Sequence, residues 1–111
     1  LTFLGFNPNG IKSKMTTVKK MLRETSASIV TIQETKCNQV GEITLDGFYI
    51  YEHVRSHREG GGVALAARKN LCPTFVSDGG ENIEALTVDI HLKDITISVT
   101  SAYGPQETSK V

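Results

Sequence analysis

One apolar run constrains this chain more than any other feature: Ala27-Ser28-Ile29-Val30-Thr31-Ile32, followed at once by Gln33-Glu34-Thr35-Lys36. Four of its first six residues are β-branched, which is typical of a buried central strand. Because an unpaired charge is costly in such a core, Glu34 is expected to emerge at the carboxyl edge of the strand. Open α/β sheets usually place ligands and metals at that edge. Glu34 is therefore the first candidate site residue.

The residues before this run predict a β-α-β unit. Residues 1–6 have a strand pattern that delivers Asn7 to an edge in the same way, and a turn follows it. We expect a helix over about 13–23, with Ser13 as a candidate N-cap. Strand 27–33 would then lie parallel to the first strand. The buried stripe of the helix recurs at the helical period and consists of Ile11, Met15, Val18 and Leu22.

The rest of the chain predicts more strands and no second helix. The expected strands cover residues 48–51, 61–67, 73–76 (weak), 83–90 and 94–102. A polar stretch, 52–60, has the composition of a hairpin connection, and 78–80 is expected to be a turn. The result is a strand-rich α/β arrangement with one helix and six or seven strands. One helix cannot cover both faces of such a sheet, so something else must cover the rest.

Composition excludes few function classes. The chain has 111 residues and a formal net charge of zero, so it is one small domain or part of a larger one, and its charge does not indicate nucleic-acid binding. We expect no membrane span and see no signal peptide, which favours an intracellular protein, nuclear or cytoplasmic. Cys37 and Cys72 favour two free thiols, with a disulfide as the alternative.

Asn7 and Glu34 together suggest a site for a hard cation. Oxygen ligands suit magnesium, which takes one or two carboxylates and keeps water and substrate phosphate as its other ligands. The alternative is structural: Asn7 would cap a turn and Glu34 a strand end. Tyr103 also follows a β run, and its phenol could donate a hydrogen bond to a phosphoryl oxygen or hold a water. Its alternative role is a half-buried tyrosine over the core.

Two other patterns carry less information. His53 and His57 have a spacing of four, but the nearby glycines and strands argue against a helical zinc pair. Arg58 belongs to a basic loop that is either solvated or in contact with a phosphate backbone. Glycines 60–62 lack a following helix and lysine, so they predict a tight hairpin and not a phosphate-binding loop.

Four segments, in order, resemble one superfamily. They are Phe6-Asn7-Pro8-Asn9-Gly10, Ile32-Gln33-Glu34-Thr35-Lys36, Gly61-Gly62-Val63-Ala64-Leu65 and Ala102-Tyr103-Gly104-Pro105. The chain resembles the endonuclease/exonuclease/phosphatase superfamily, and most of all the endonuclease domain of LINE-type retrotransposons. The resemblance implies a four-layered α/β sandwich, in which two packed mixed β-sheets are flanked by helices.

The resemblance also implies roles for individual residues. Glu34 would bind the metal, which would be Mg²⁺ or alternatively Mn²⁺, and Asn7 would help to hold the metal or the scissile phosphate. Tyr103 would lie near that phosphate. Asn9 stands where abasic-site enzymes usually carry an aspartate, and Gln106 where other retrotransposon endonucleases can contact DNA. Asn9, Arg58 and Gln106 are thus the candidate substrate-binding residues.

The chain departs from the superfamily in one large respect. Members normally continue with a Gly-Asp-Phe-Asn-like segment and a Ser-Asp-His-like segment, and neither occurs before Val111. The resemblance therefore implies that residues 1–111 are the N-terminal half of such a domain. We expect the isolated chain to have no useful hydrolytic activity, because the water-activating aspartate and the phosphate-binding histidine are missing.

The expected function is that of a magnesium-dependent DNA endonuclease that nicks target DNA for retrotransposon integration. Its expected partners are DNA and either a reverse transcriptase domain on the same polypeptide or a complementing second half. One alternative is an abasic-site or exonuclease III-like repair enzyme, or another phosphodiesterase or phosphatase of the superfamily. The other is a non-catalytic, domesticated fragment that acts as a binding module.

Overall fold

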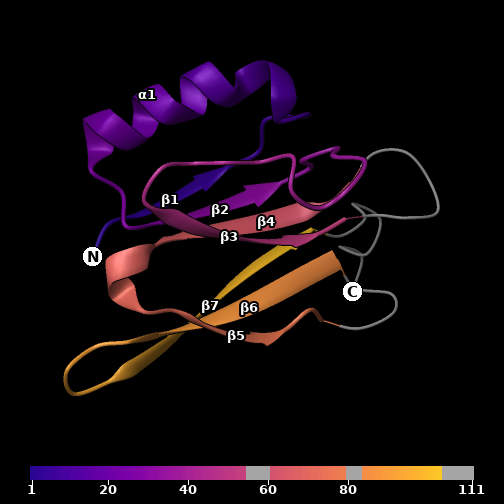
Figure 1. Cartoon of the computed structure of the whole chain (residues 1–111). Helices are drawn as coiled ribbons and strands as arrows, with labels where there is room; N and C mark the ends of the chain where they lie inside the picture. The colour runs from indigo at the N-terminus through magenta and orange to yellow at the C-terminus, as the bar shows by residue number, and fades with distance from the viewer. Residues whose placement is uncertain (55–60, 80–83, 104–111) are drawn as a thin grey trace, which may run out of the picture.

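The computed structural model describes residues 1–54, 61–79 and 84–103, which form three layers (Figure 1). A helix lies over a four-stranded sheet, and a three-stranded sheet packs against the other face of that sheet. The elements in chain order are β1 (Phe3–Phe6), η1 (Lys12–Lys14), α1 (Met15–Thr25), β2 (Ile29–Gln33), β3 (Phe48–His53), β4 (Val63–Arg68), η2 (Lys69–Leu71), β5 (Thr74–Ser77), β6 (Glu84–His91) and β7 (Thr96–Tyr103).

The first sheet has the strand order β1-β2-β4-β3 and is mixed. β1 and β2 are parallel, with Phe6 opposite Ile32, so the predicted β-α-β unit is confirmed. β4 pairs antiparallel with both β2 and β3. Because β1 and β2 run the same way, the residues that follow them, Asn7 and Glu34, emerge at the same edge of the sheet.

The second sheet has the order β5-β6-β7 and is antiparallel throughout the described strands. Its inner face carries Leu86, Val88 and Ile90, all fully buried, which confirms the alternation predicted there. The predicted weak strand exists as β5, with a register shift between Phe75 and Ser77. The strand expected over 94–102 is β7, which begins two residues later than predicted, so Ile95 precedes it and is exposed.

Two cores account for the apolar pattern of β2 and β4. Val30, Ile32, Ala64 and Ala66 face the helix layer, where Val18 and Leu22 of α1 pack against them. Ile29, Val63, Leu65 and Ala67 face the second sheet. Both faces of these strands are therefore buried, which is why their sequences are continuously apolar. Burial of each large side chain contributes about 1.5–3 kcal/mol to stability.

The predicted start of the helix is wrong in one detail. Ser13 does not cap α1; the chain enters it through η1, and Lys14 occupies the N-cap position with no side-chain hydrogen bond. The buried stripe is confirmed, since Ile11, Val18 and Leu22 are buried and Met15 packs against the same core. α1 ends with Ser26 in a left-handed conformation, whose N–H donates to the carbonyl of Leu22.

Two smaller predictions can be compared with the described ranges. Cys37 is buried and Cys72 is exposed, and both are free thiols as expected. The helices of the described ranges are all too short or too polar to cross a membrane.

Candidate functional site at the carboxyl ends of β1 and β2

The two candidate residues at the sheet edge are in direct contact. Asn7 Nδ2 donates a hydrogen bond of 2.8 Å to Glu34 Oε2. The residues are far apart in sequence. They meet because β1 and β2 are parallel neighbours, and Asn7 and Glu34 are the first residues after these strands. Asn7 is exposed and Glu34 is partly exposed, so an ion from solvent can reach the carboxylate.

The orientation of the Asn7 amide follows from two contacts. Its Oδ1 accepts a 3.1 Å hydrogen bond from the backbone N–H of Asn9, while its Nδ2 faces Glu34. A hydrogen-bond network of this kind assigns which amide atom is oxygen and which is nitrogen. In this geometry the amide nitrogen faces the carboxylate, so Asn7 orients the Glu34 side chain.

The backbone at Glu34 has an unusual conformation. Glu34 has φ 53° and Lys36 has φ 55°, both in the left-handed region that side-chain-bearing residues seldom adopt. The Glu34 carbonyl accepts a 2.9 Å hydrogen bond from Gly10 N, and Thr35 N donates to Gly62 O at 3.2 Å. These bonds from both neighbouring segments hold the turn that places the Glu34 side chain at the edge.

Gly62 leaves the space that this turn needs. A Cβ on Gly62 would lie 2.5 Å from Thr35 Oγ1, and Gly62 has φ +87°. Thr35 is almost fully buried beneath the Glu34 turn. Glycines 60–62 are expected to permit a tight hairpin. Gly62 also permits close packing against Thr35, the residue that follows Glu34.

Tyr103 reaches the same edge from the second sheet. Gln33 Nε2 donates 3.0 Å to Ser101 Oγ, and Ser101 Oγ donates 3.3 Å to the carbonyl of Ile32. These bonds join the end of β2 to β7. Because alternate residues of a strand share a face, Tyr103 is on the same side of β7 as Ser101, two residues further along the strand and opposite Glu84. Tyr103 is partly buried and packs against the inter-sheet core.

Sequence reasoning missed Glu84, Gln33 and Ser101. Glu84 begins β6 opposite Tyr103, and its Oε1 accepts a 2.7 Å hydrogen bond from Gly62 N. It is a second carboxylate at this end of the molecule, bound to the glycine that supports the Glu34 turn. Its place as the first residue of a strand is the signal that could have identified it. The Gln33–Ser101 bond had no such signal, because it depends on how the two sheets pack.

The donor set suits magnesium better than a transition metal. The described part of the chain holds no cluster of three or more His, Cys, Asp or Glu side chains that could bind a metal. Magnesium needs only one or two carboxylates and fills its other positions with water and phosphate oxygens. Glu34 fits that requirement, and Asn7 would fix its orientation. His53 ends the strand β3, and His57, the other histidine of the pair with a spacing of four, lies outside the described residues.

Two of the predicted substrate-binding residues, Arg58 and Gln106, lie outside the described residues. Asn9, the third, is exposed with φ 53°, and its backbone supports Asn7.

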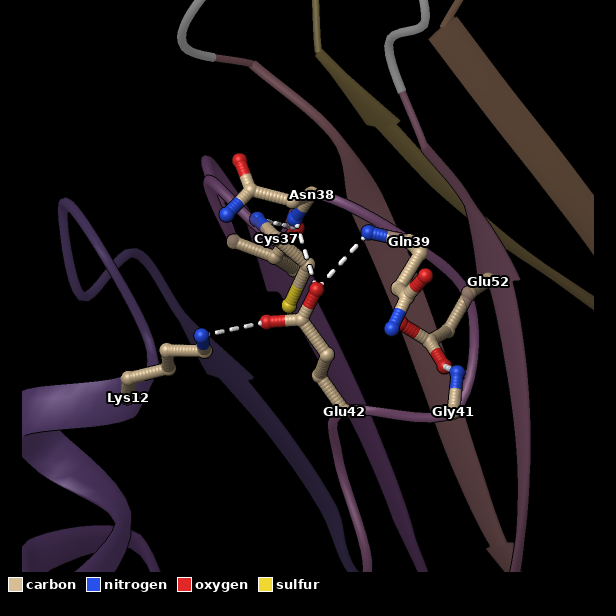
Figure 2. Close-up of polar contacts among 8 residues, drawn as sticks. Lys12, Cys37, Asn38, Gln39, Gly41, Glu42 and Glu52 are labelled. Carbon is tan, nitrogen blue, oxygen red and sulfur yellow. Dashed lines mark hydrogen bonds and ion pairs between the residues drawn. The ribbon is translucent and has the colours of Figure 1, made fainter.

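The loop that follows Glu34 is held by two carboxylates (Figure 2). Glu42 Oε2 accepts hydrogen bonds from the N–H groups of Asn38 and Gln39, at 2.9 and 2.7 Å, and its Oε1 forms a 2.7 Å ion pair with Lys12. The hydrogen bond from Lys12 is the largest cause of the lowered pKa of Glu42. The same contact raises the pKa of Lys12.

Glu52 in β3 completes this support. Its Oε2 accepts a 2.9 Å hydrogen bond from Gly41 N, and its Oε1 is buried without a hydrogen-bond partner among the described residues. Burial raises the pKa of Glu52, the Gly41 bond opposes this, and the nearby Glu42 charge adds to it. Burial likewise raises the pKa of the Cys37 thiol.

Comparisons with known proteins agree on one fold. A model of the Endonuclease/Exonuclease/phosphatase family matches residues 4–104. Curated protein sequences gave no match. Several solved structures are similar to this chain. The AP endonuclease LMAP from Leishmania major is similar with a TM-score of 0.72 and a sequence identity of 16%. The Xenopus laevis APE2 catalytic domain is similar with a TM-score of 0.72 and a sequence identity of 17%. The endonuclease domain of TRAS1, a telomere-specific non-LTR retrotransposon, has 0.71 at 18%.

These similarities show the fold over part of each relative. The matches cover 96, 96 and 95% of this chain, but 42, 46 and 48% of LMAP, APE2 and TRAS1 respectively. The chain thus spans less than half the length of the solved structures it matches. The predicted α/β arrangement of two packed sheets is confirmed by both the structure and these neighbours.

Proposed function

The chain belongs to the endonuclease/exonuclease/phosphatase family, and from that premise we propose that it supplies the metal-holding part of a magnesium-dependent DNA endonuclease. Within the family we favour the LINE-type retrotransposon branch, in which a nick in target DNA would serve integration. The similarity to the TRAS1 endonuclease domain and the Asn7-Pro8-Asn9-Gly10 turn support this choice.

The observation that carries the proposal is the 2.8 Å hydrogen bond between Asn7 and Glu34 at one edge of the sheet. An amide that binds one carboxylate oxygen fixes the carboxylate plane and leaves its charge directed toward solvent. Such an arrangement prepares a carboxylate to bind a cation, because little further ordering is needed. A strand cap alone would not require the second residue.

Each residue then has a stated role. Glu34 would hold Mg²⁺, with Mn²⁺ as the alternative ion, and Asn7 would hold Glu34 in place. The Tyr103 phenol would donate a hydrogen bond to a phosphoryl oxygen of the substrate. A bound magnesium ion would neutralise charge that develops on the phosphate. Asn9, Arg58 and Gln106 remain candidates for contacts with the DNA backbone, which would position the substrate without reading sequence.

The test is a plasmid-nicking assay on the polypeptide encoded by the complete reading frame that contains these residues. Glu34→Gln should lower the magnesium-dependent nicking rate by about a hundredfold or more, and Asn7→Ala by about 10–100-fold. Glu24→Gln is the matched control, because Glu24 is exposed on α1. Equal activity of the Glu34 and Glu24 variants would contradict the proposal. The isolated 111-residue chain is expected to be inactive, and magnesium-dependent nicking by it would overturn that expectation.

The second candidate is an abasic-site endonuclease. It is favoured by the similarity to the AP endonuclease LMAP at a TM-score of 0.72. Asn9 argues against it, since abasic-site enzymes usually carry an aspartate there. A duplex with one abasic site, compared with the intact duplex in the same assay, separates the two candidates. A strong preference for the abasic duplex would select the repair enzyme.

The reading frame beyond Val111 tests the retrotransposon role and the binding-module alternative together. A Gly-Asp-Phe-Asn-like segment, a Ser-Asp-His-like segment and a reverse transcriptase domain would support the endonuclease. A stop codon directly after Val111 would favour a non-catalytic binding module or a half-domain that a second chain completes.

A further inference from the structure

A pocket lies at the opposite end of the first sheet from Glu34. It has a volume of about 380 Å³ and lies between the last turns of α1, the chain before β3 and the end of β4. The residues that matter in its lining are Lys19, Leu22, Arg23, Asp46, Phe48 and Arg68. Its volume is within the range of small-molecule sites, which is about 300–1,000 Å³.

The charge of this pocket favours an anion. Lys19 and Arg23 are four residues apart on α1 and therefore share one face of the helix, and Arg68 adds a third cation from β4. Asp46 is the one acidic residue in the lining. Cations near the end of a helix also interact favourably with its free carbonyls. That effect does not explain Arg68, which belongs to a different element.

Arg68 is held in place before any ligand binds. Its Nε donates a 2.9 Å hydrogen bond to the carbonyl of Ala27, and its guanidinium carbon lies 4.8 Å from the centre of the Phe48 ring. These contacts fix the plane of the guanidinium. A guanidinium with a fixed plane presents its other N–H donors as a fork, which matches two oxygens of a phosphate.

The pocket also has apolar and hydrogen-bonding groups that an organic part attached to a phosphate could contact. Leu22 and Phe48 are almost fully buried and give it an apolar wall. The Asp46 carboxylate can accept a hydrogen bond from a hydroxyl or amino group. We propose that this pocket binds a small phosphate monoester with an organic part, such as a nucleoside monophosphate. Its phosphate would contact Lys19, Arg23 and Arg68, and its organic part would lie over Leu22, because the Arg68 guanidinium already lies over the Phe48 ring.

This site is separate from the candidate metal site. Gly62 immediately precedes β4 and bonds to Thr35 beside Glu34, whereas Arg68 ends β4. At the rise of an extended strand, the two ends are about 20 Å apart. One phosphate group cannot reach both, so the proposal does not depend on the proposed nuclease function.

The test is an NMR titration of the ¹⁵N-labelled chain with three probes: adenosine 5′-monophosphate, inorganic phosphate and adenosine. We expect saturable shifts at the amides of Leu22, Arg23 and Phe48, with the monophosphate binding more tightly than either of the other probes. Arg23→Gln should weaken monophosphate binding about tenfold, the effect of losing one charge-assisted contact. Arg68→Lys keeps the charge but loses the fork, so it should also weaken binding.

Lys20→Gln is the matched control, because Lys20 is an exposed cation on the same helix and outside the pocket lining. It should change the affinity by less than about twofold. Equal losses in the Lys20 and Arg23 variants would show diffuse attraction to a basic helix and overturn the proposal. Equal affinities for phosphate and the monophosphate would refute the organic part of the site. The absence of saturable shifts would refute the whole proposal.

Discussion

At the scale of single residues, the candidate metal site depends on backbone conformations that are unfavourable in isolation. Asn9, Glu34 and Lys36 all have φ between 53 and 55°. Such conformations cost about 1–3 kcal/mol each and persist only where the surroundings impose them. Here the bonds from Gly10 and to Gly62 impose them around Glu34. Unfavourable conformations concentrated around the partly exposed Glu34 carboxylate support a functional role for it.

Gly62→Ala tests this packing. The new Cβ would meet Thr35 Oγ1 and would also sit at a positive φ. Gly47→Ala is the matched control: Gly47 has φ +84° but nothing within 4 Å of its Cβ. We expect Gly62→Ala to lower the free energy of unfolding by about 1–3 kcal/mol more than the control does. Urea denaturation measures the difference, and equal losses in both variants would mean that the contact with Thr35 does not matter.

Glu52→Gln tests the buried carboxylate under the loop. Burial raises the pKa of Glu52 in the folded state. The pKa of this carboxyl is about 4.3 in the unfolded state and higher in the folded state. Between these two pKa values the folded state binds more protons than the unfolded state, so Glu52 lowers the free energy of unfolding as the pH rises through this range. A glutamine at this position would keep an acceptor for Gly41 N without the charge.

We therefore expect Glu52→Gln to raise the urea midpoint relative to wild type near pH 7 more than near pH 4. The control is Glu24→Gln, because the Glu24 side chain is exposed. The urea midpoint of this variant should change with pH as that of wild type does. Parallel profiles for wild type and Glu52→Gln would show that Glu52 titrates alike in the folded and unfolded states.

At the scale of elements, the order and direction of β1, α1 and β2 could be predicted from the sequence, because helical and strand periodicity are local. The meeting of Asn7 and Glu34 followed from that unit alone. The capping role of Ser13 was wrong, since the chain enters α1 through a 3₁₀ turn. Gln33 and Ser101 could not be found, because their contact depends on the packing of two sheets that local patterns do not specify.

Ser101→Ala tests the link between the sheets. Ser101 is fully buried and bonds both Gln33 and the carbonyl of Ile32. Its loss would leave the Gln33 amide without that partner, at a cost of about 1–3 kcal/mol in the free energy of unfolding. Ser98→Ala on the same strand is the control; Ser98 is exposed, and its hydroxyl donates a 2.6 Å hydrogen bond to Asp89 Oδ1 that water can replace, so its loss should cost less than that of Ser101. Equal losses of unfolding free energy in the two variants would show that the buried hydrogen bonds of Ser101 do not add to stability.

At the scale of the whole molecule, the described residues form a two-sheet scaffold with distinct features at its two ends. The edge at Asn7 and Glu34 carries the proposed metal site, and the opposite end carries the cationic pocket of α1 and β4. The pocket could not be predicted from the sequence, because Lys19, Arg23 and Arg68 come together only when α1 packs over the sheet. The sequence shows Lys19 and Arg23 on the expected helix, but it does not show that Arg68 lies beside them.

Binding of a divalent metal by Glu34 can be measured with paramagnetic Mn²⁺ added to the ¹⁵N-labelled chain. We expect the amide signals of Glu34, Lys36 and Gly62 to broaden first, Glu34→Gln to abolish this broadening, and Glu24→Gln to leave it unchanged. Glutamine keeps an acceptor for Asn7 and removes only the charge. Broadening that is centred elsewhere, or that persists in Glu34→Gln, would show that Glu34 does not hold the metal.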